Sequence, residues 1–566
     1  MNRPNDEPST AITPHPASGP GASARSRGMR FKLAALALTL ISALAGTGLA
    51  YWLKPAAPAI EPPKPEPKYG IPARLFPNWG KPDFVLILSA QQHGYMLPCG
   101  CSSPQVGGLE RRYNFMQLLK ARGWTPVAVD LGDVPQRTGP VKLPNVQGLL
   151  KYQYSMKALE RMGYLGVGVG EFEAAYSLAR IEGEWAANND TPAVLAGNLH
   201  EPENTFPLLK TMAVQTVPGC GVKVGATNII GPTVAERIKD PTVKFERTDK
   251  SLNQLLKNMQ AAKVDLPILL YHGSATPRED GVKEAIACAE KYPQFPVIVC
   301  LSEEDEPPGR PEIVNDPKSG TRNYVFRLGH KGKNIGVLGV YRNGPGNSAF
   351  AFKYQLVEMG EEYMTPKEQE GDHPIQKLME DYTRELKDKN YLARYGQSKH
   401  ILQALPPVAG LRNPGDGVPT YIGSEACGKC HVSAYEVWEK SDHSHAYKTL
   451  VKAHHPSLRQ YDGECIVCHT VGFGYNGGFT DDKKTAKLKN VGCESCHGPG
   501  SLHAKNPKDR EWQQRMNQPW RGAKDANAKT RAIDNFCMTC HDTDNDVTWI
   551  HNAFPKKWQK IIHTKD

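Results

Sequence analysis

The sequence lacks a long basic run, and its cysteines do not divide into an even set of pairs. The net charge of +10 is spread along 566 residues, so the chain has no basic patch of the kind that binds nucleic acid. Eight of the 13 cysteines belong to one repeated motif, and an odd remainder argues against a complete disulfide framework. The remaining five are Cys99, Cys101, Cys220, Cys288 and Cys300.

The repeated motif is CxxCH, and its four copies lie in the last quarter of the chain. CxxCH is the attachment signature of c-type haem. Its two thiols bond to the haem vinyl groups, and the adjacent imidazole reaches the iron. Paired zinc ribbons are the alternative, but they have no need of a histidine after every CxxC. The predicted attachment residues are Cys427, Cys430, His431, Cys465, Cys468, His469, Cys493, Cys496, His497, Cys537, Cys540 and His541.

Other histidines of the same region are candidates for the second axial position of each iron. Ligation by two histidines makes low-spin iron that is suited to electron transfer. Seven candidates for four irons are a surplus, so the pairing stays open at this point. The candidates are His443, His445, His454, His455, His503, His551 and His563.

The N-terminus predicts a membrane anchor. Residues 1–30 are polar and are expected to form a disordered cytoplasmic tail. The uncharged apolar run Leu33–Leu53 follows basic residues, so residues 31–54 are expected to span a bilayer. The alternative is a signal peptide cleaved near Ala43-Leu-Ala45. Both interpretations predict an extracytoplasmic, periplasmic body, and the first also predicts that this body stays anchored to the membrane.

Residues 81–360 alternate between strand-like and helix-like segments, which predicts an α/β layered domain. A Pro-rich linker, residues 55–80, precedes it. Strands are expected at Phe84–Leu88, Pro126–Leu131, Tyr164–Val169, Ile268–Tyr271, Val297–Cys300, Tyr324–Val340 and Phe350–Val357, and helices at Gly107–Gly123 and Tyr154–Met162.

The loops after these strands resemble those of calcineurin-like metallophosphoesterases of the 5'-nucleotidase type. That family carries its metal ligands in five blocks, and two metals activate a water. The order of the blocks is kept here, but most ligands are missing: the first block reads Gln91-Gln-His93 and the third reads Gly170-Glu-Phe172. The ligands left are His93, Asp133 and His272. The resemblance therefore implies the fold without ordinary phosphoesterase activity.

A rebuilt site for one metal ion is a second hypothesis for this domain. Cys99 and Cys101 closely follow His93, and two thiols with an imidazole suit zinc or another soft metal. The set would then comprise His93, Cys99, Cys101, Asp133 and His272. A surface disulfide or two packed thiols is the simpler interpretation of the same cysteines.

Residues 361–420 are expected to join the two domains. Asp372–His400 has apolar residues close to helical spacing, which predicts one long amphipathic helix, and a Pro/Gly-rich stretch follows it. Residues 421–566 form the predicted haem domain, in which the haems supply much of the core and the secondary structure is mostly short helices and irregular segments.

The haem domain resembles the tetrahaem cytochrome family of the hydroxylamine-oxidation type. The resemblance is carried by Ser441-Asp-His443-Ser-His445 and by Cys493-Glu-Ser-Cys-His-Gly-Pro-Gly-Ser-Leu-His503. It implies that His443, His503 and His563 are distal ligands, and that His445 replaces His443 or serves another iron. The family also leaves one haem without a strong distal ligand.

Together these features predict a multidomain chain: an N-terminal transmembrane helix, an α/β metallophosphoesterase-like layered domain, and a mostly-α or irregular multihaem cytochrome c domain. The expected function is electron transfer between redox partner proteins through four covalently bound c-type haems, with one additional metal ion as an option in the middle domain. Two alternatives stay open. One is an oxidoreductase that acts on a small nitrogen or sulfur oxide at an open haem iron, and the other is a metal-dependent phosphoesterase fused to a cytochrome.

Overall fold

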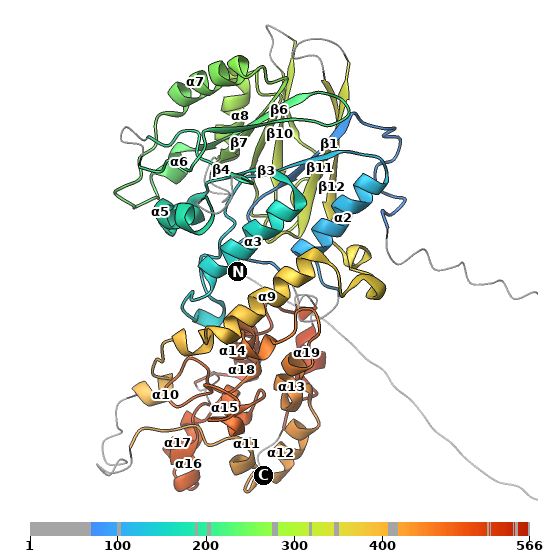
Figure 1. Ribbon diagram of the computed structural model, residues 1–566. Helices are drawn as coiled ribbons and strands as arrows, with labels where there is room; N and C mark the ends of the chain where they lie inside the picture. Colours follow the sequence, from blue (N-terminus) through green and yellow to red (C-terminus); the bar gives the residue numbers. More distant parts are fainter. Residues whose placement is uncertain are drawn as a thin grey trace, which may run out of the picture. The chain divides into compact units, whose positions relative to one another are not determined.

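The computed structural model describes residues 70–98, 104–186, 191–200, 205–273, 281–315, 320–343, 350–405, 417–517, 520, 522–546, 548–549 and 553–563. These residues lie in one compact unit, Lys68–Asp566. Two six-stranded sheets form the α/β part of this unit, and short helices form its C-terminal part (Figure 1).

The first sheet has the strand order β12-β11-β1-β2-β3-β4. Strands β1 to β4 run parallel, whereas β11 pairs antiparallel with β1 and β12 pairs antiparallel with β11. The strands predicted at Phe84, Pro126, Tyr164 and Phe350 all form, and they belong to this sheet. Its strands are β1 (Phe84–Ser89), β2 (Pro126–Asp130), β3 (Tyr164–Gly168), β4 (Ala193–Leu195), β11 (Asn334–Arg342) and β12 (Phe350–Glu358).

The second sheet has the order β5-β6-β7-β8-β10-β9, with β6, β7, β8 and β10 parallel. The single closing strand predicted over Tyr324–Val340 is two strands, because residues 329–333 turn the chain from β10 in this sheet to β11 in the first. The strands are β5 (Met212–Thr216), β6 (Lys223–Ile230), β7 (Leu266–His272), β8 (Val297–Leu301), β9 (Glu312–Asn315) and β10 (Arg322–Leu328).

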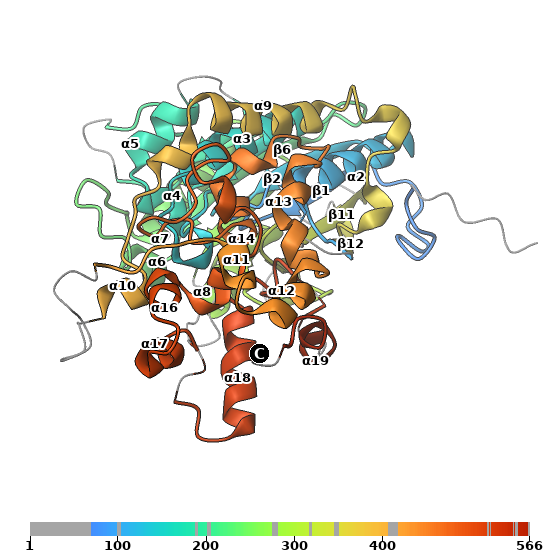
Figure 2. The same cartoon turned by 90° about the horizontal axis from the view of Figure 1, so that it is seen from below.

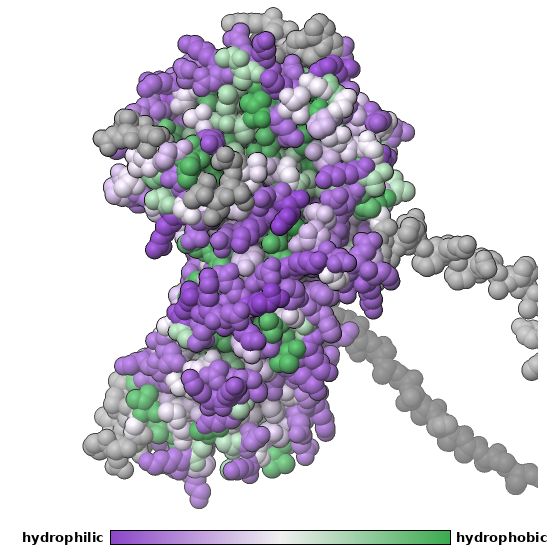
Figure 3. Space-filling model, in the orientation of Figure 1, coloured by the Kyte–Doolittle hydropathy of each residue, from purple (hydrophilic) through white to green (hydrophobic). Residues whose placement is uncertain are grey.

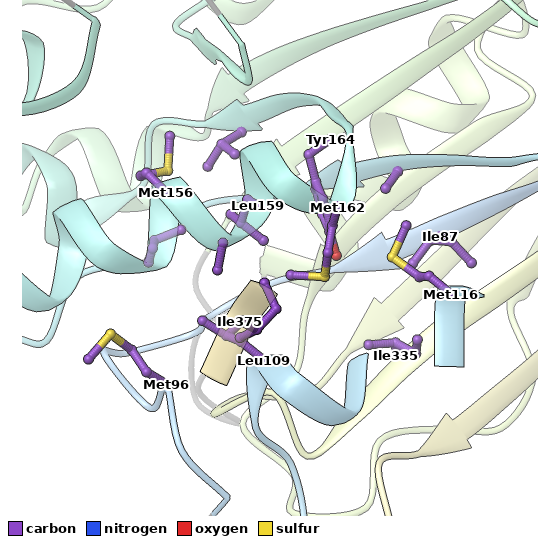
Figure 4. Close-up of a cluster of buried hydrophobic side chains, with 14 of the residues drawn as sticks. Ile87, Met96, Leu109, Met116, Met156, Leu159, Met162, Tyr164, Ile335 and Ile375 are labelled. Atoms are coloured by element: carbon purple, nitrogen blue, oxygen red, sulfur yellow. The ribbon is translucent and has the colours of Figure 1, made fainter. Parts of the chain in front are cut away.

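The two sheets pack face to face with helices on both outer faces. Alternate residues of β1 show this: Leu86 belongs to the core between the sheets, and Ile87 belongs to the core under the helices. On the first sheet this outer core gathers Leu109, Met156 and Ile375 from three helices (Figure 4). The long outer helices are α2 (Leu109–Ala121), α3 (Gly148–Met162) and α9 (Pro374–Asp388) on the first sheet, and α7 (Thr248–Ala261) and α8 (Gly281–Lys291) on the second.

The single long helix predicted over Asp372–His400 is wrong. Helix α9 ends at Asp388, and Asn390 then adopts a left-handed conformation with φ 49°, which an α-helix cannot continue. A 3₁₀ turn at Tyr391–Arg394 and the short α10 (Ile401–Ala404) follow. The other α-helices in the described ranges before residue 417 are short: α4 (Glu171–Ala175), α5 (Leu178–Ile181) and α6 (Pro232–Ala235).

The C-terminal part consists of short helices joined by irregular segments (Figure 2). This agrees with the sparse secondary structure expected of a chain wrapped around haems. The helices are α11 (Ser424–Gly428), α12 (Val432–Glu439), α13 (Ala446–Val451), α14 (Gly463–His469), α15 (Cys493–His497), α16 (Ser501–Lys505), α17 (Arg510–Arg515), α18 (Ala526–Cys537) and α19 (Ala553–Trp558).

The prediction of an N-terminal transmembrane helix is corrected. None of the helices in the described ranges is long and apolar enough to cross a membrane. The predicted span, residues 31–54, lies outside those ranges. The membrane-anchored location rested on that helix and is withdrawn with it. On the face seen in Figure 3, hydrophilic residues predominate, and hydrophobic ones occur singly or in small groups.

Candidate functional site: the four CxxCH motifs and the strand-end cluster

Each CxxCH motif folds as a single helical turn. The amide of His431 donates to the carbonyl of Cys427 at 2.9 Å, and His541 repeats this bond to Cys537 at 2.9 Å. A helical turn puts the first cysteine and the histidine on the same side of the backbone, because residues four apart share one helix face. Helices α14 and α15 end at the histidines of the second and third motifs.

All four motifs open into one cavity of about 3100 Å³. A pocket for one drug-sized ligand has about 300–1,000 Å³, so this cavity is large enough for several prosthetic groups. Its wall includes the eight cysteines and four histidines of the motifs, and five further histidines: His93, His400, His443, His503 and His563. The residues therefore fit covalently bound c-type haem in size and in chemistry.

Three of the motif histidines face a second histidine across this cavity. The ring centres of His431 and His503 are 6.0 Å apart, those of His541 and His443 are 6.1 Å apart, and His497 and His563 repeat the 6.1 Å separation. Two imidazoles that bind one metal from opposite sides, each with its nitrogen about 2 Å away, have ring centres about 6 Å apart. The three pairs thus have the spacing of paired axial ligands.

The fourth motif histidine, His469, has no such partner among the described histidines. Its only hydrogen bonds within those ranges join Nδ1 to the carbonyl of Ala446 at 2.6 Å and to the Thr449 hydroxyl at 3.5 Å. His445 is exposed, and His455 lies near two carboxylates of the 370–380 segment. His454 is exposed as well, and His551 lies outside the described residues.

The Nδ1 atoms of three motif histidines are hydrogen-bonded on the side away from the cavity. His497 Nδ1 lies 2.6 Å from the carbonyl of Met516, and His541 Nδ1 lies 2.9 Å from a carboxylate oxygen of Asp546. A proton on Nδ1 leaves the Nε2 lone pair for a metal, and the partner fixes the orientation of the ring. Burial lowers the pKa of His497 and of His469. Both rings are therefore neutral at pH 7, which metal binding requires.

Contacts between cysteines give the order of the attachment sites in space. Cys427 of the first motif is hydrogen-bonded to Cys493 of the third. Cys468 of the second motif is hydrogen-bonded to Cys540 of the fourth. Cys496 of the third motif lies near Cys537 and Cys540 of the fourth. The order in space is therefore first, third, fourth, second, which differs from the order along the chain.

The strand-end cluster lies where the loops after β1, β2, β3 and β7 meet. It brings together His93, Asp133 and His272, as the resemblance to phosphoesterases requires. His272 Nε2 lies 2.9 Å from Asp133 Oδ2, and both side chains are buried. The second carboxylate oxygen accepts a hydrogen bond from the amide of Phe172 at 2.8 Å.

Each member of this buried pair favours the charged form of the other. Burial alone would raise the pKa of Asp133, but the adjacent His272 outweighs it and holds that pKa below its usual value. Burial would likewise lower the pKa of His272, and Asp133 reverses the direction and raises it. His272 therefore lies within ion-pair distance of the carboxylate, although neither of its ring nitrogens has a hydrogen-bond partner of good geometry in the described part of the chain.

One further residue shapes the cluster. Glu173 directly follows the third block, Gly170-Glu-Phe172, and was not singled out from the sequence. Its carboxylate accepts hydrogen bonds from the amides of Asp133, Val134 and Gly170 at 2.8–2.9 Å. Burial raises the pKa of Glu173 to about 8. This side chain holds the loops after β2 and β3 together.

The described residues do not fit a metal centre in this domain. Within the described ranges, no group of three or more His, Cys, Asp or Glu side chains is placed to hold a metal ion. His93 is close to the pair, and burial lowers its pKa to about 4. Its Nε2 is buried without a hydrogen-bond partner in the described part of the chain. Cys99 and Cys101, the other predicted ligands, lie outside the described residues.

We expect Gly170→Ala to destabilise the fold by about 1–3 kcal/mol, because the new Cβ overpacks a buried site. That atom would stand 2.3 Å from Asp133 Oδ1 and 2.6 Å from His272 Nε2. Denaturant unfolding of the two proteins measures the difference. Gly183→Ala is the control, since a Cβ there meets nothing within 4 Å and should change stability by less than about 0.5 kcal/mol. Equal effects of the two substitutions would contradict the packing described.

The α/β part contacts the second and fourth motifs directly. Lys151 of α3 pairs with Glu464, the residue before Cys465, and Gln147 donates to Asp462 at 2.9 Å. The hydroxyl of Tyr95, in the loop after β1, donates to Asp544 at 3.0 Å. The strand-end cluster borders the same cavity, because His93 lines it as well.

Sequence comparisons agree with the geometry of the motifs. Residues 426–498 match the family of cytochrome c554 and c-prime. Cytochrome c-554 of Nitrosomonas europaea is 36% identical over 91 residues, which cover 14% of this chain and 39% of that protein. The predicted resemblance to tetrahaem cytochromes is therefore confirmed for this stretch, which spans well under half the length of the relative it matches.

Structure comparisons find nucleotidases and related hydrolases. A 5'-nucleotidase precursor of Thermus thermophilus is 20% identical, with a TM-score of 0.43 over 54% of this chain and 59% of its own. A sulfate thiohydrolase of the same organism is 13% identical, with a TM-score of 0.43 over 56% and 62%. The NAD nucleotidase of Haemophilus influenzae is 15% identical, with a TM-score of 0.41 over 63% and 75%. These neighbours belong to the class predicted for the middle domain, and at this similarity they say nothing about activity.

Proposed function

We propose that this chain is a tetrahaem c-type cytochrome that transfers electrons between redox partner proteins. The three histidine pairs carry the proposal, because ring centres 6.0–6.1 Å apart have the spacing of two axial ligands on one iron. The haems supply one-electron Fe(III)/Fe(II) chemistry at these sites. The match to a cytochrome family over residues 426–498 supports the same conclusion.

In this proposal the chain's own residues attach, orient and tune the prosthetic groups. The eight motif cysteines anchor them, and the histidine pairs hold the axial positions. The Nδ1 partners differ between motifs: His497 faces the carbonyl of Met516, whereas His541 faces the carboxylate of Asp546. A carboxylate makes the imidazole a stronger donor and favours the ferric state, so we expect the fourth haem to have a lower potential than the third.

A second candidate function is oxidation or reduction of a small nitrogen or sulfur oxide. His469 is the observation that favours it, because no described histidine lies opposite its ring. Its motif is next to the α/β part, where Lys151 pairs with Glu464. In this reading the second motif holds an iron with an open position, and the wall of the cavity near it includes residues of the α/β part. Electrons would reach it through the fourth motif, whose Cys540 contacts Cys468.

One spectroscopic experiment tests both candidates. The purified, oxidised chain is examined by EPR, and the haem content of the same sample is determined by pyridine haemochromogen assay and by intact mass. Four haems with three low-spin signals and one high-spin signal are expected. Carbon monoxide should then bind to the reduced protein at one haem per chain.

The outcomes separate the proposals. Four low-spin signals would exclude the open site and leave the electron carrier. Fewer than four covalent haems would contradict the tetrahaem proposal itself. A high-spin signal that also persists in the His551→Ala variant would exclude a weak ligand from that residue, and nitrite, hydroxylamine and nitric oxide would be the next ligands to titrate.

A further inference from the structure

Asp544 lies three residues after the histidine of the fourth motif and is held by side chains of the α/β part. The hydroxyl of Tyr95 donates to Oδ2 at 3.0 Å, and Lys331 Nζ donates to the same oxygen. Lys333 Nζ is 3.5 Å from Oδ1. The three charged side chains are only 14–21% exposed. An ion-pair cluster this shielded from water is stronger than a surface pair.

The groups that hold Asp544 come from two neighbouring segments of the α/β part, the loop after β1 and the turn between β10 and β11. Tyr95 stands two residues after His93, in the loop after β1. Lys331 lies in the turn between β10 and β11, and its amide donates to the carbonyl of Gln91 at 2.7 Å. Gln91, His93 and Lys331 have φ of 51°, 50° and 61°, a conformation that residues other than glycine adopt rarely. Such strain persists where the surrounding contacts require it.

On the other side, Asp544 is tied to the axial ligand His541 by a closed turn. Asp542 Oδ1 accepts hydrogen bonds from the amides of Asp544 at 3.0 Å and Asn545 at 2.7 Å. The amide of Asp546 donates to the carbonyl of Asp542 at 2.8 Å. The carboxylate of Asp546 in turn contacts His541 Nδ1 at 2.9 Å. Movement of Asp544 is therefore transmitted to the group that orients His541.

We propose that the loop after β1 and the turn between β10 and β11 serve in this chain as a clamp on residues 541–546 and set the reduction potential of the fourth haem. The inference rests on haem attachment at Cys537 and Cys540, as proposed above. Asp544 and Tyr95 are positioning residues in this arrangement: they act on the iron through the turn that ends at Asp546, and through the charge balance beside it.

The direction in which the reduction potential of the fourth haem changes follows from two contributions. Loss of the Asp544 charge leaves Lys331 and Lys333 without this counter-ion, and positive charge next to a haem favours the ferrous state. Loosening of the turn weakens the contact between Asp546 and His541, so the imidazole becomes a poorer donor to ferric iron. Both changes raise the potential. Tyr95→Phe alters no charge, so it tests the positioning contribution alone.

The test is a redox titration of the full-length holoprotein, monitored by optical spectroscopy and EPR. The fourth haem is assigned as the signal absent from the Cys537→Ala/Cys540→Ala variant. For Asp544→Asn we expect the ratio of ferrous to ferric fourth haem at a given potential to rise about tenfold. For a one-electron couple this corresponds to a reduction potential higher by about 59 mV. Tyr95→Phe should raise the reduction potential of the same haem by less than Asp544→Asn does. The g-values of that haem should change in both variants, and Asp544→Glu should restore part of the shift.

Asp305→Asn is the matched control. Asp305 pairs with the same Lys333 at 2.9 Å, but its side chain is 68% exposed and its described contacts do not include residues 541–546. The Asp305→Asn variant should keep the reduction potentials of all four haems unchanged. A fourth-haem potential in Asp544→Asn equal to that of the control would overturn the clamp, as would an equal shift of all four haems. A mass that shows no haem at Cys537 and Cys540 would overturn the attachment and the clamp together, whereas an unshifted potential in a four-haem protein removes the clamp alone.

Discussion

Replacing His443 by alanine is expected to convert one low-spin haem into a high-spin haem. His443 faces His541 with ring centres 6.1 Å apart, and the two cysteines of the fourth motif keep the haem attached when the distal ring is lost. The oxidised variant should then show two high-spin haems instead of one. Carbon monoxide bound to the reduced protein should rise from one to two per chain. EPR and a ligand titration measure both quantities.

His445 provides the matched control for this experiment. It stands two residues from His443 in the same 3₁₀ turn, Asp442–His445, but it is exposed and does not line the cavity. The His445→Ala variant should keep the spin states and the ligand stoichiometry of the parent. An unchanged spectrum for His443→Ala, or a new high-spin signal for His445→Ala, would contradict the pairing read from the ring distances.

A large loss of folding stability is expected from a substitution in the strand-end cluster. Asp133→Asn removes the charge that pairs with His272 while keeping the shape of the side chain. It also suits the φ of 55° at this position, because asparagine tolerates the left-handed region. Removal of one partner from a buried ion pair costs about 3–5 kcal/mol. Because the asparagine still offers hydrogen bonds, we expect about 3 kcal/mol less free energy of unfolding at pH 6.

The pH dependence of this loss has a definite sign. Asp133 has a lowered pKa, so its contribution is present above the ordinary carboxyl value of about 3.9 and is lost as the pH falls through the folded value. His272 has a raised pKa, so its contribution is present below about 6.5 and is lost as the pH rises through the folded value. The difference between parent and variant should therefore be largest between about pH 4 and pH 6.5.

Denaturant unfolding at a series of pH values checks this expectation. Asp372→Asn is the control, because its carboxylate is fully exposed and pairs only with the surface residue Lys377 in the described contacts. That substitution should change stability by less than about 0.5 kcal/mol at every pH. Equal losses for the two variants, or a loss at Asp133 that does not vary with pH, would refute an ionised buried pair.

The cluster also explains why sequence reasoning reached only part of this site. The block pattern identified His93, Asp133 and His272, and the structure brings all three to one end of the sheets. It could not show that His272 contacts Asp133 directly, since β7 and the loop after β2 meet only through packing of the two sheets. The hydrogen bonds between Glu173 and the backbone amides could not be predicted from the sequence either, because they depend on the close approach of two loops.

For the α/β part, apolar runs and their alternation with helical patterns were enough to locate β1, β2, β3, β7, β8 and β12. They missed the short or amphipathic strands β4, β5 and β9, whose residues carry a weaker apolar signal. They also missed β6, in which Gly-Ala-Thr-Asn interrupts the apolar residues. The long helix expected after residue 372 failed for a local reason. The apolar spacing continues past Asp388, but Asn390 turns the backbone out of the helix.

The sequence by itself determined the attachment chemistry of this protein. CxxCH is a local motif: two cysteines and a histidine within five residues adopt one helical turn, and no distant contact is needed to bring them together. Tertiary structure alone decided which histidine faces which. His431 and His503 stand 72 positions apart in the sequence. The resemblance favoured His443 and left His445 as its replacement, and the fold places His443 opposite His541 while His445 is exposed. Long-range packing also made the α/β part a neighbour of the second and fourth motifs, which no local pattern encodes.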